Sequence, residues 1–411
     1  MGTEVTFNPW DPGFAENPYE QYAALRERGG AISTGTGLML VPRYEGCFAV
    51  LRTPGTSVDE RNATLDVFGQ PPADALDGRD RRGAQSILTL DPPDHTRLRR
   101  LVSSAFTVRR VEGLRDRITA QVSDLLDDLA ARGKGGEPVD LIAHFAFPLP
   151  FAVIHDLLGM PDGDRTELRR WSHLITRFLE PLTDPEDLRE SLEASDNMEA
   201  HIREAIAWKR RNPADDLLSA MIAAEDDGDR LNTVELIDQV RLLYLAGHET
   251  TVNLIGNGTL ALLRNRKELE RLVGDPELDA NAVDELLRYD SPVQLSRRIA
   301  LTSIEVDGEV AGPGDLVVTF LGSANRDEAK WGPTAAELDL GRAGAGSHLA
   351  FGSGIHHCLG ANLARMEGAA AIPALVRRFP DMELATDRPD WNGRMVLRGL
   401  DSLPVTLGVT A

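Results

Sequence analysis

Cysteine is scarce in this chain: Cys47 and Cys358 are the only two, and they form no paired motif. Such sparse cysteine usage predicts a reducing compartment, and we expect the cytoplasm. Long apolar runs are also missing, since none approaches the roughly 20 residues that span a bilayer. The N-terminus lacks the basic segment and apolar core of a signal peptide. Residues 1–6 fit a myristoylation pattern, but so loose a pattern often matches by chance, and we expect no membrane partner.

Positively charged residues are in deficit: the chain has 44 Lys and Arg against 65 Asp and Glu, which gives a formal net charge of −21. This excess of acid argues against nucleic acid or an anionic membrane as a partner. Apolar content is 42% and charged content 27%, which is ordinary for a globular protein. No internal repeat or low-complexity linker divides the chain, so we expect one domain over residues 1–411, large enough to enclose a cofactor.

What the chain does contain is a glycine-rich loop around Cys358. Residues 351–360 read Phe-Gly-Ser-Gly-Ile-His-His-Cys-Leu-Gly, and a helical pattern follows from Ala361. Cys358 is therefore expected where a loop becomes a helix, near orphan N–H groups and the positive end of the helix dipole, which favour a thiolate. Gly352 and Gly354 avoid Cβ clashes, so loop amides can turn toward the sulfur, as donors that tune an iron-bound thiolate do.

The loop alone leaves three other interpretations open. A lone cysteine is usually a small buried apolar residue, which is our prediction for Cys47. With His348, His356 and His357 the Cys358 thiol could bind zinc, although three adjacent residues cannot easily aim at one metal. A cysteine at a helix start could also be a hydrolase nucleophile with a distant histidine.

The pattern Phe-Gly-x-Gly-x-His-x-Cys-Leu-Gly resembles the haem-binding loop of cytochromes P450, which are haem-thiolate monooxygenases. The resemblance implies that Cys358 is the axial ligand of haem b and that Phe351 packs beside the sulfur. It also implies that His356 bonds a haem propionate, and that Gly352 and Gly360 border the cofactor.

A second informative stretch covers residues 91–102, where two prolines start a helix cleanly. His95 and Arg99 are four residues apart and share one helix face. Arg97 and Arg100 point elsewhere and read as solvated basic residues. The stretch resembles the family's helix beside the haem, which implies that His95 and Arg99 bind propionates; arginine suits a carboxylate because it can donate two parallel hydrogen bonds.

The longest helical pattern covers about residues 233–263 and is apolar on nearly every face, so we expect a buried helix roughly 45 Å long. A polar island, Gly-His-Glu-Thr-Thr, interrupts it, and such local conflicts tend to mark functional sites. Alternatively, Thr250 bonds back to the Ala246 carbonyl and Glu249 reaches solvent. The island resembles the family's oxygen-activation motif. This implies that Ala246 and Gly247 open the helix over the haem, and that Glu249 and Thr250 relay protons to dioxygen.

Glu285 and Arg288 form a further motif, as neighbours at i,i+3 on a helical pattern. The spacing alone means little, since an exposed pair adds about 0–1 kcal/mol. Its place between the long helix and the cysteine loop matches the family, in which the pair is buried and locks the fold. By resemblance the third member is an arginine before the loop. Arg342 is our candidate, although the segment before it departs from the family's Pro-Asp/Glu-Arg-Phe pattern.

The remaining patterns predict a mainly helical α+β fold with small sheets, the cytochrome P450 fold. Short strands are expected at 38–41, 304–306, 316–320 and 395–397. Further helices are expected at about 19–27, 44–51, 111–132, 140–158, 164–179, 185–211 and 215–225. By resemblance Arg298 binds a propionate and region 54–90 caps the substrate. The resemblance further implies these substrate contacts: Leu88, Leu243, Val293, Gln294, Leu295, Val396 and Leu397.

These motifs follow the family's order over nearly the whole chain, and the resemblance implies a monooxygenase. One atom of O2 would enter a small lipophilic substrate such as a polyketide or macrolide, a terpenoid or a steroid. No flavin or nicotinamide domain is visible, so electrons would come from an NAD(P)H-dependent ferredoxin reductase through a ferredoxin. That donor is expected to dock on the cysteine side, with Arg97, Arg100 and Arg365 as candidate contacts.

Two rival functions keep the haem but differ in chemistry. One is a peroxide-driven haem peroxygenase, and the other is a haem-binding sensor or carrier without turnover. The Glu249-Thr250 pair argues against both, because neither needs a proton relay. A carbon-monoxide difference spectrum followed by NADH-dependent product formation separates the three.

Overall fold

The computed structural model describes residues 7–65, 86–161, 163–181, 184–224 and 231–408. The myristoylation-like residues 1–6, and residues 66–85 of the expected substrate cap, lie outside the described residues. The chain forms two compact units. Unit 1 comprises Met1–Thr56, Arg115–Pro150 and Thr250–Ala411, and unit 2 comprises Ser57–Leu114 and Phe151–Glu249. The single domain expected over residues 1–411 stays a prediction.

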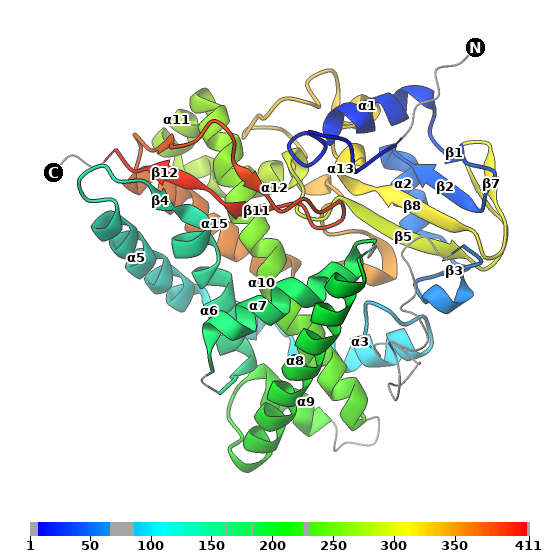
Figure 1. The fold of residues 1–411 in the computed structure, drawn as a ribbon, viewed down its shortest axis with the longest axis horizontal. Coiled ribbons are helices and arrows are strands. Elements are labelled where there is room, and N and C mark those ends of the chain that lie inside the picture. Colours follow the sequence, from blue (N-terminus) through cyan, green and yellow to red (C-terminus); the bar gives the residue numbers. More distant parts are fainter. Residues whose placement is uncertain (1–6, 66–85, 162, 182–183, 225–230, 409–411) are drawn as a thin grey trace. The chain divides into compact units, whose positions relative to one another are not determined.

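Unit 1 carries most of the strands and the helices on either side of the cysteine loop (Figure 1). Its helices are α1 Tyr19–Arg28, α2 Tyr44–Arg52, α5 Arg115–Arg132, the π-helical turn η2 Ile142–Ala146, α11 Arg266–Gly274, η4 Pro276–Leu278, α12 Asp279–Tyr289, α13 Leu321–Ala324, α14 Glu328–Trp331, η5 Ala345–Ser347, η6 Gly354–His356 and α15 Ala361–Arg378. Its strands are β1 Ile32–Ser33, β2 Leu38–Val41, β4 Val139–Asp140, β5 Leu295–Ala300, β6 Ile304–Val306, β7 Glu309–Ala311, β8 Leu316–Phe320, β9 Glu383–Leu384, β10 Asp390–Trp391, β11 Leu400–Ser402 and β12 Pro404–Thr406.

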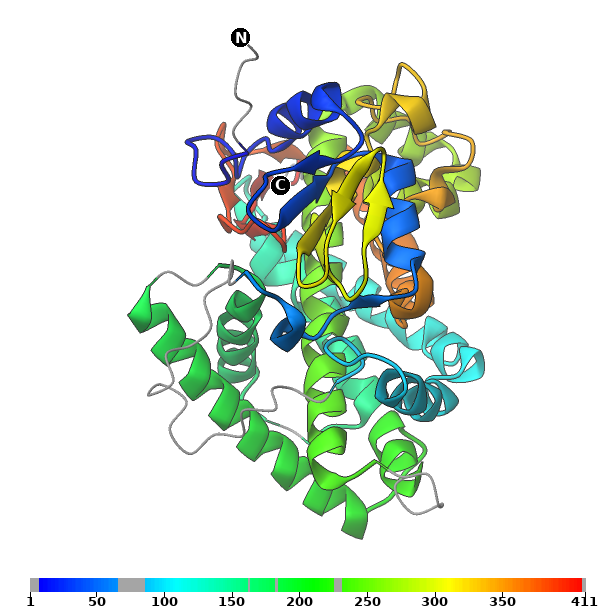
Figure 2. The same ribbon diagram turned by 90° about the vertical axis from the view of Figure 1, so that its right-hand side faces the viewer.

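The largest sheet has the strand order β1-β2-β8-β5-β3, with β3 at Thr56–Ser57. Strand β2 runs parallel to β8, and β5 runs antiparallel to it. Helix α2 packs behind these strands (Figure 2). Cys47 on α2 is buried in this core, with its sulfur 3.0 Å from the Val41 carbonyl oxygen. Burial raises the pKa of the Cys47 thiol, which confirms the prediction of an inert apolar residue.

Unit 2 is helical, with α7 (Arg165–Ile175) packed along α8 (Pro185–Arg211), and α3 (Asp94–Ala105) packed on α9 (Leu217–Ala224). Helix α8 begins cleanly because Asp184 accepts a hydrogen bond from the Glu186 amide and proline occupies the first helical position. A buried ion pair, Lys209–Asp216, ties the end of α8 to the segment before α9. The elements of unit 2 are η1 Glu60–Asn62, α3 Asp94–Ala105, α4 Val108–Glu112, α7 Arg165–Ile175, η3 Thr176–Leu179, α8 Pro185–Arg211 and α9 Leu217–Ala224.

Helix α10 spans Thr233–Arg264 and confirms the long helix predicted from the apolar pattern. The division between the units falls within it, between Glu249 and Thr250. Helix α6, Pro148–Leu158, also crosses the division. In the described part of the chain no helix combines the length and apolarity needed to cross a membrane.

Two predicted elements are wrong in detail. The helix expected over 140–158 is divided into β4, η2 and α6, because Pro148 has no N–H to continue the hydrogen-bond ladder. The strand expected at 395–397 does not form; Leu397 makes only an isolated bridge to Val293. The chain turns just before it, where Gly393 takes a φ of 67°, so no regular strand can build up.

Candidate functional site

The cysteine loop of unit 1 leads directly into α15, as predicted. Gly354 has a φ of 71°, and a Cβ placed on it would lie 2.3 Å from the Leu51 backbone oxygen, so only glycine fits. The Cys358 N–H donates to the Phe351 carbonyl at 2.9 Å, which closes the loop just before α15 begins at Ala361. Cys358 is exposed. The thiol therefore lies at a helix start, where a thiolate is favoured.

Two further residues of unit 1 carry the donors expected for a propionate. Arg298 lies on β5 and is buried; its Nη1 donates to Ser296 Oγ at 3.1 Å and to the Arg297 carbonyl at 2.7 Å. His356 ends η6 and is half-buried. A buried guanidinium and a half-buried imidazole suit a carboxylate.

Helix α3 of unit 2 carries His95, which is buried, and Arg99, which is half-buried like Arg97. Arg100 is exposed, as predicted. The prediction for Arg97 is wrong, because its guanidinium forms an ion pair with Glu235, a largely buried residue at the start of α10. An arginine at this position balances a buried carboxylate that would otherwise be costly to desolvate.

Exposure changes along α10 just before the polar island. Ala246 is exposed, while Leu243 and Tyr244 are buried. Gly247 allows α6 to pack closely against α10, because a Cβ at this position would lie 2.7 Å from two side-chain carbons of Ile154 on α6. The glycine thus allows close helix packing within unit 2, which is a structural reason for it that the sequence alone did not reveal.

His248 is a residue of this island whose role sequence reasoning missed. Its Nδ1 lies 2.7 Å from the Tyr244 carbonyl oxygen, and because a carbonyl only accepts, Nδ1 carries a proton. Its Nε2 lies 3.4 Å from Glu249 Oε1. The Glu249 side chain is 15% exposed, so it keeps partial access to solvent beside the His248 imidazole. The available signal was the i,i+4 spacing of Tyr244 and His248 on a buried helix.

The Glu285–Arg288 pair is fully buried in unit 1. Arg288 donates to both carboxylate oxygens, at 2.7 and 2.8 Å, and also to the backbone carbonyls of Asn325, Ala335 and Glu337. Arg342 Nε donates to Glu285 Oε1 at 3.1 Å. Because buried charges are stabilised here by several hydrogen bonds, removing one partner is costly, about 3–5 kcal/mol. The cluster fixes the segment that leads to the cysteine loop.

The expected substrate contacts fall in different surroundings. Val293 and Leu397 lie side by side through their bridge. Gln294 is buried and donates to the Ser291 carbonyl at 2.7 Å and to the Tyr19 hydroxyl at 3.2 Å. The other apolar contacts differ in burial: Leu295 and Leu243 are buried, Val396 is half-buried and Leu88 is 47% exposed.

The zinc interpretation of Cys358 is contradicted. Over the residues that the structure describes, no three His, Cys, Asp or Glu side chains gather where they could hold a metal ion. His348 is instead engaged on both ring nitrogens, with Asp284 and with the Ala350 N–H. It therefore has no nitrogen left for a metal.

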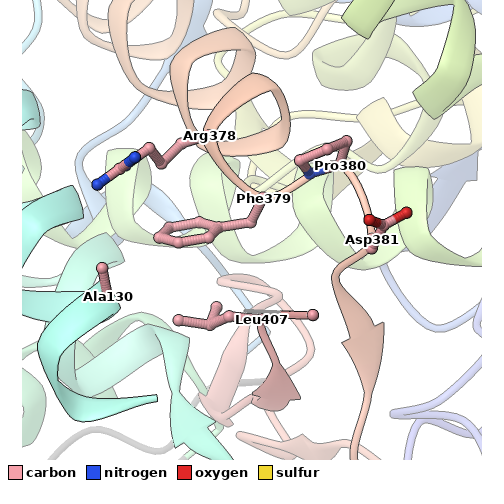
Figure 3. Close-up of a pocket in the computed structure, with 7 residues that line it drawn as sticks. Ala130, Arg378, Phe379, Pro380, Asp381 and Leu407 are labelled. Atoms are coloured by element: carbon pink, nitrogen blue, oxygen red, sulfur yellow. The ribbon is translucent and has the colours of Figure 1, made fainter. Parts of the chain in front are cut away.

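A surface recess of about 260 Å³ lies at the far end of α15 from the cysteine loop (Figure 3). The Phe379 ring and Leu407 face each other across it, and Arg378 forms an ion pair with Asp127 at 3.3 Å. None of the predicted site residues lines it. Its lining offers no nucleophile or buried polar group, so it is not the candidate site.

Comparison with known proteins identifies the class. The family model described as cytochrome P450 matches residues 63–398. The chain is 43% identical over 411 residues to cytochrome P450 107B1 of Saccharopolyspora erythraea, covering 97% of both chains. It is 40% identical over 403 residues to the vitamin D(3) 25-hydroxylase of Pseudonocardia autotrophica, covering 96% of this chain and 95% of that one.

A third relative is the polyketide biosynthesis cytochrome P450 PksS of Bacillus subtilis, 39% identical over 422 residues, with 98% of this chain and 99% of that one covered. The solved structure of PksS matches with a TM-score of 0.85 at 37% identity, over 98% of this chain and 100% of that chain. This protein belongs to the cytochrome P450 family. It has the P450 fold and is a haem-thiolate oxidoreductase of the monooxygenase type.

The residues present fit a haem-thiolate cofactor. Unit 1 supplies an exposed thiol at a helix start and the buried cation Arg298. Unit 2 supplies His95 and Arg99 on one face of α3, and the exposed Ala246 on α10, close in sequence to the buried Leu243 and Tyr244. Unit 1 therefore carries a soft ligand for iron, and both units carry donors that suit a carboxylate.

Proposed function

We propose that this P450 uses haem b to insert one oxygen atom of O2 into a small lipophilic substrate, and that a polyketide or macrolide is the first class to test. Terpenoids and steroids are the next classes. The observation that carries the proposal is the thiol of Cys358, placed by a glycine-dependent loop at the start of α15 in a chain of this family. We place the protein in the cytoplasm, because its two cysteines suit a reducing compartment.

The candidate site residues have the following proposed roles. Cys358 binds the iron, with Phe351, Gly352 and Gly360 around it. When bound, the haem supplies the oxidising chemistry, and the protein supplies ligand, protons and pocket shape. Thr250 and Glu249 deliver protons, and the His248 imidazole, held by the Tyr244 carbonyl, faces the Glu249 carboxylate. The remaining proposed cofactor contacts are His95, Arg99, Ala246, Gly247, Arg298 and His356.

The names of the relatives support a lipophilic substrate but disagree about its class. One is named for polyketide biosynthesis and another for vitamin D(3) hydroxylation. A library of macrolides, linear polyketides, terpenoids and steroids should therefore be screened for substrate-induced Soret shifts. The proposal expects the largest shifts with polyketides, followed by a hydroxylated or epoxidised product under NAD(P)H and O2. Shifts confined to steroids would overturn the choice of class.

Removing the propionate partners is expected to lower haem occupancy. We propose that Arg99 and Arg298 each bind a propionate. An alanine substitution would leave that desolvated carboxylate without its partner, at a cost of about 2–5 kcal/mol in binding free energy. Arg99→Ala should lower the haem content of purified protein, and the double variant with Arg298→Ala should lower it further. Arg100→Ala, at the neighbouring exposed position, is the control and should retain full occupancy. Full occupancy in the double variant would contradict the assignment.

An acidic electron donor is expected to use exposed arginines of this acidic protein. We propose a ferredoxin, supplied by an NAD(P)H-dependent reductase. Of the three candidate contacts, Arg100 is the exposed residue, whereas the Arg97 and Arg365 side chains are only 28% and 33% exposed, so Arg100 is the best test. Ferredoxin-driven turnover should slow as salt rises, because exposed charges are screened. Arg100→Glu should raise KM for ferredoxin without changing the rate of dithionite reduction; an unchanged KM would contradict the contact.

A further inference from the structure

The aromatic ring of Phe351, at the start of the cysteine loop, is flanked by two polar side chains of unit 1. The Arg365 guanidinium carbon lies 4.7 Å from the ring centroid. The His348 ring centroid lies 5.4 Å away, with the two planes tilted by 47°. A guanidinium over an aromatic face attracts it, by about 0.5–1 kcal/mol at exposed sites and more when desolvated. The Phe351 ring is therefore held in a defined position between α15 and the segment before the loop.

One carboxylate on α12 anchors both of these side chains. Asp284 Oδ1 accepts from Arg365 Nε at 2.7 Å and from His348 Nε2 at 3.2 Å. His348 Nδ1 accepts from the Ala350 N–H at 3.1 Å, so Nε2 must carry the proton of a neutral ring. The contacts of both flanking groups thus converge on a single oxygen atom.

The charge states agree with this geometry. Burial lowers the pKa of His348, in line with a neutral imidazole. Burial works against ionisation of Asp284, but the hydrogen bonds from His348 and Arg365 outweigh it and hold the pKa of that carboxyl below its usual value. Gly346 makes room for the carboxylate, since a Cβ there would lie 3.0 Å from Asp284 Oδ2. The anchor is therefore an ionised group in a close-fitting site.

We propose that Asp284 is a positioning residue for the cysteine ligand. Through Arg365 and His348 it fixes the ring of Phe351, and with it the Phe351 carbonyl that accepts the Cys358 N–H. That hydrogen bond sets the backbone from which the thiolate projects. The inference rests on the proposed function, because it assumes that Cys358 binds the iron. It also assigns Arg365 to holding the loop rather than to docking the electron donor.

The chain offers a matched control for this idea. Arg377 on α15 pairs with Asp279 on α12 at 2.6 Å, so this pair joins the same two helices. Its exposure is similar, 29% on both sides against 33% for Arg365 and 21% for Asp284. Asp279→Asn therefore removes a comparable link between α12 and α15 at a position far from the loop.

The test compares Asp284→Asn with Asp279→Asn in the haem-loaded protein. Asp284→Asn should shift the iron–sulfur stretching frequency and the haem reduction potential. It should also make the thiolate Soret band of the reduced carbon-monoxide complex decay roughly tenfold faster, the lower end of effects typical of groups behind a metal ligand. Asp279→Asn should leave all three properties as in the wild type. Equal changes in both variants, or none in Asp284→Asn, would overturn the proposal.

A second variant keeps the test decisive if Asp284→Asn does not fold. Arg365→Lys can retain the ion pair with Asp284 but loses the planar group over the Phe351 ring. It should shift the same iron–sulfur frequency, and a wild-type frequency would overturn the proposal. Failure of the proposed function looks different, because the wild-type protein itself would then lack the thiolate band.

Discussion

Replacing Cys358 with histidine is expected to abolish the red-shifted Soret band of the reduced, carbon-monoxide-bound protein while part of the haem stays bound. An imidazole can bind iron, but it does not donate electron density as a thiolate does. The propionate contacts proposed on β5 and α3 remain in this variant, so cofactor binding should weaken rather than vanish. The measurement is the carbon-monoxide difference spectrum, read together with the haem content per chain.

The second cysteine supplies the control for this experiment. Cys47 is buried in the core of unit 1, and burial raises the pKa of its thiol, so it is a poor thiolate donor. Cys47→Ala should keep the red-shifted band. Cys358→Ala should lose it entirely, since alanine offers no ligand. If Cys358→Ala kept the thiolate spectrum, another group would have to be the ligand and the central assignment would fail.

Local sequence signals predicted the elements around the site well. The helix after the cysteine loop begins at Ala361, where the glycine-rich segment stops and the apolar periodicity of a helix starts. Both features lie within a few residues of each other, so the sequence alone could predict this boundary. The length of α10 followed from its apolar pattern in the same way. The buried Glu285–Arg288 pair also has a local spacing, although only its order in the chain distinguished it from a chance match.

Contacts between distant segments could not be read from the sequence. Arg97 pairs with Glu235, which lies 138 residues further along the chain. Asp284 meets His348 and Arg365, which are 64 and 81 residues away. Charge patterning along a helix says which face is polar, but not which opposite charge the fold brings to it. Charge patterning therefore predicts a solvated Arg97, whereas the fold pairs it with Glu235.

Replacing Thr250 with alanine is expected to uncouple NAD(P)H consumption from product formation. The proposed role of the hydroxyl is to donate a hydrogen bond to the dioxygen and to accept one from a water, while Glu249 supplies the next proton. Electron supply does not depend on this hydroxyl, so NAD(P)H should be consumed at a near-normal rate. Without the hydroxyl, protons would no longer be directed to the correct oxygen atom. Most of the O2 consumed should therefore be released as hydrogen peroxide, and little product should form.

The helix itself should tolerate this change, since alanine is the best helix former and the difference from threonine is at most about 0.7 kcal/mol. Lost product can therefore be attributed to the missing hydroxyl rather than to unfolding. Thr250→Ser restores a hydroxyl and should restore much of the coupling. Thr251→Ala, at the adjacent buried position, is the control and should stay coupled.

Replacing the Glu249 carboxylate, next to Thr250 in the sequence, should change turnover in a different way. Glu249 is the proposed source of the next proton, and its side chain lies largely buried beside the His248 imidazole. Glu249→Gln removes the titratable proton but keeps the shape, so the whole cycle should slow and its solvent isotope effect should change, without the excess peroxide of Thr250→Ala. The measurement is product and peroxide formed per NAD(P)H oxidised, in H2O and in D2O. If Thr250→Ala is as well coupled as the wild type, the protons take another route, through Thr251 or a hydroxyl of the substrate.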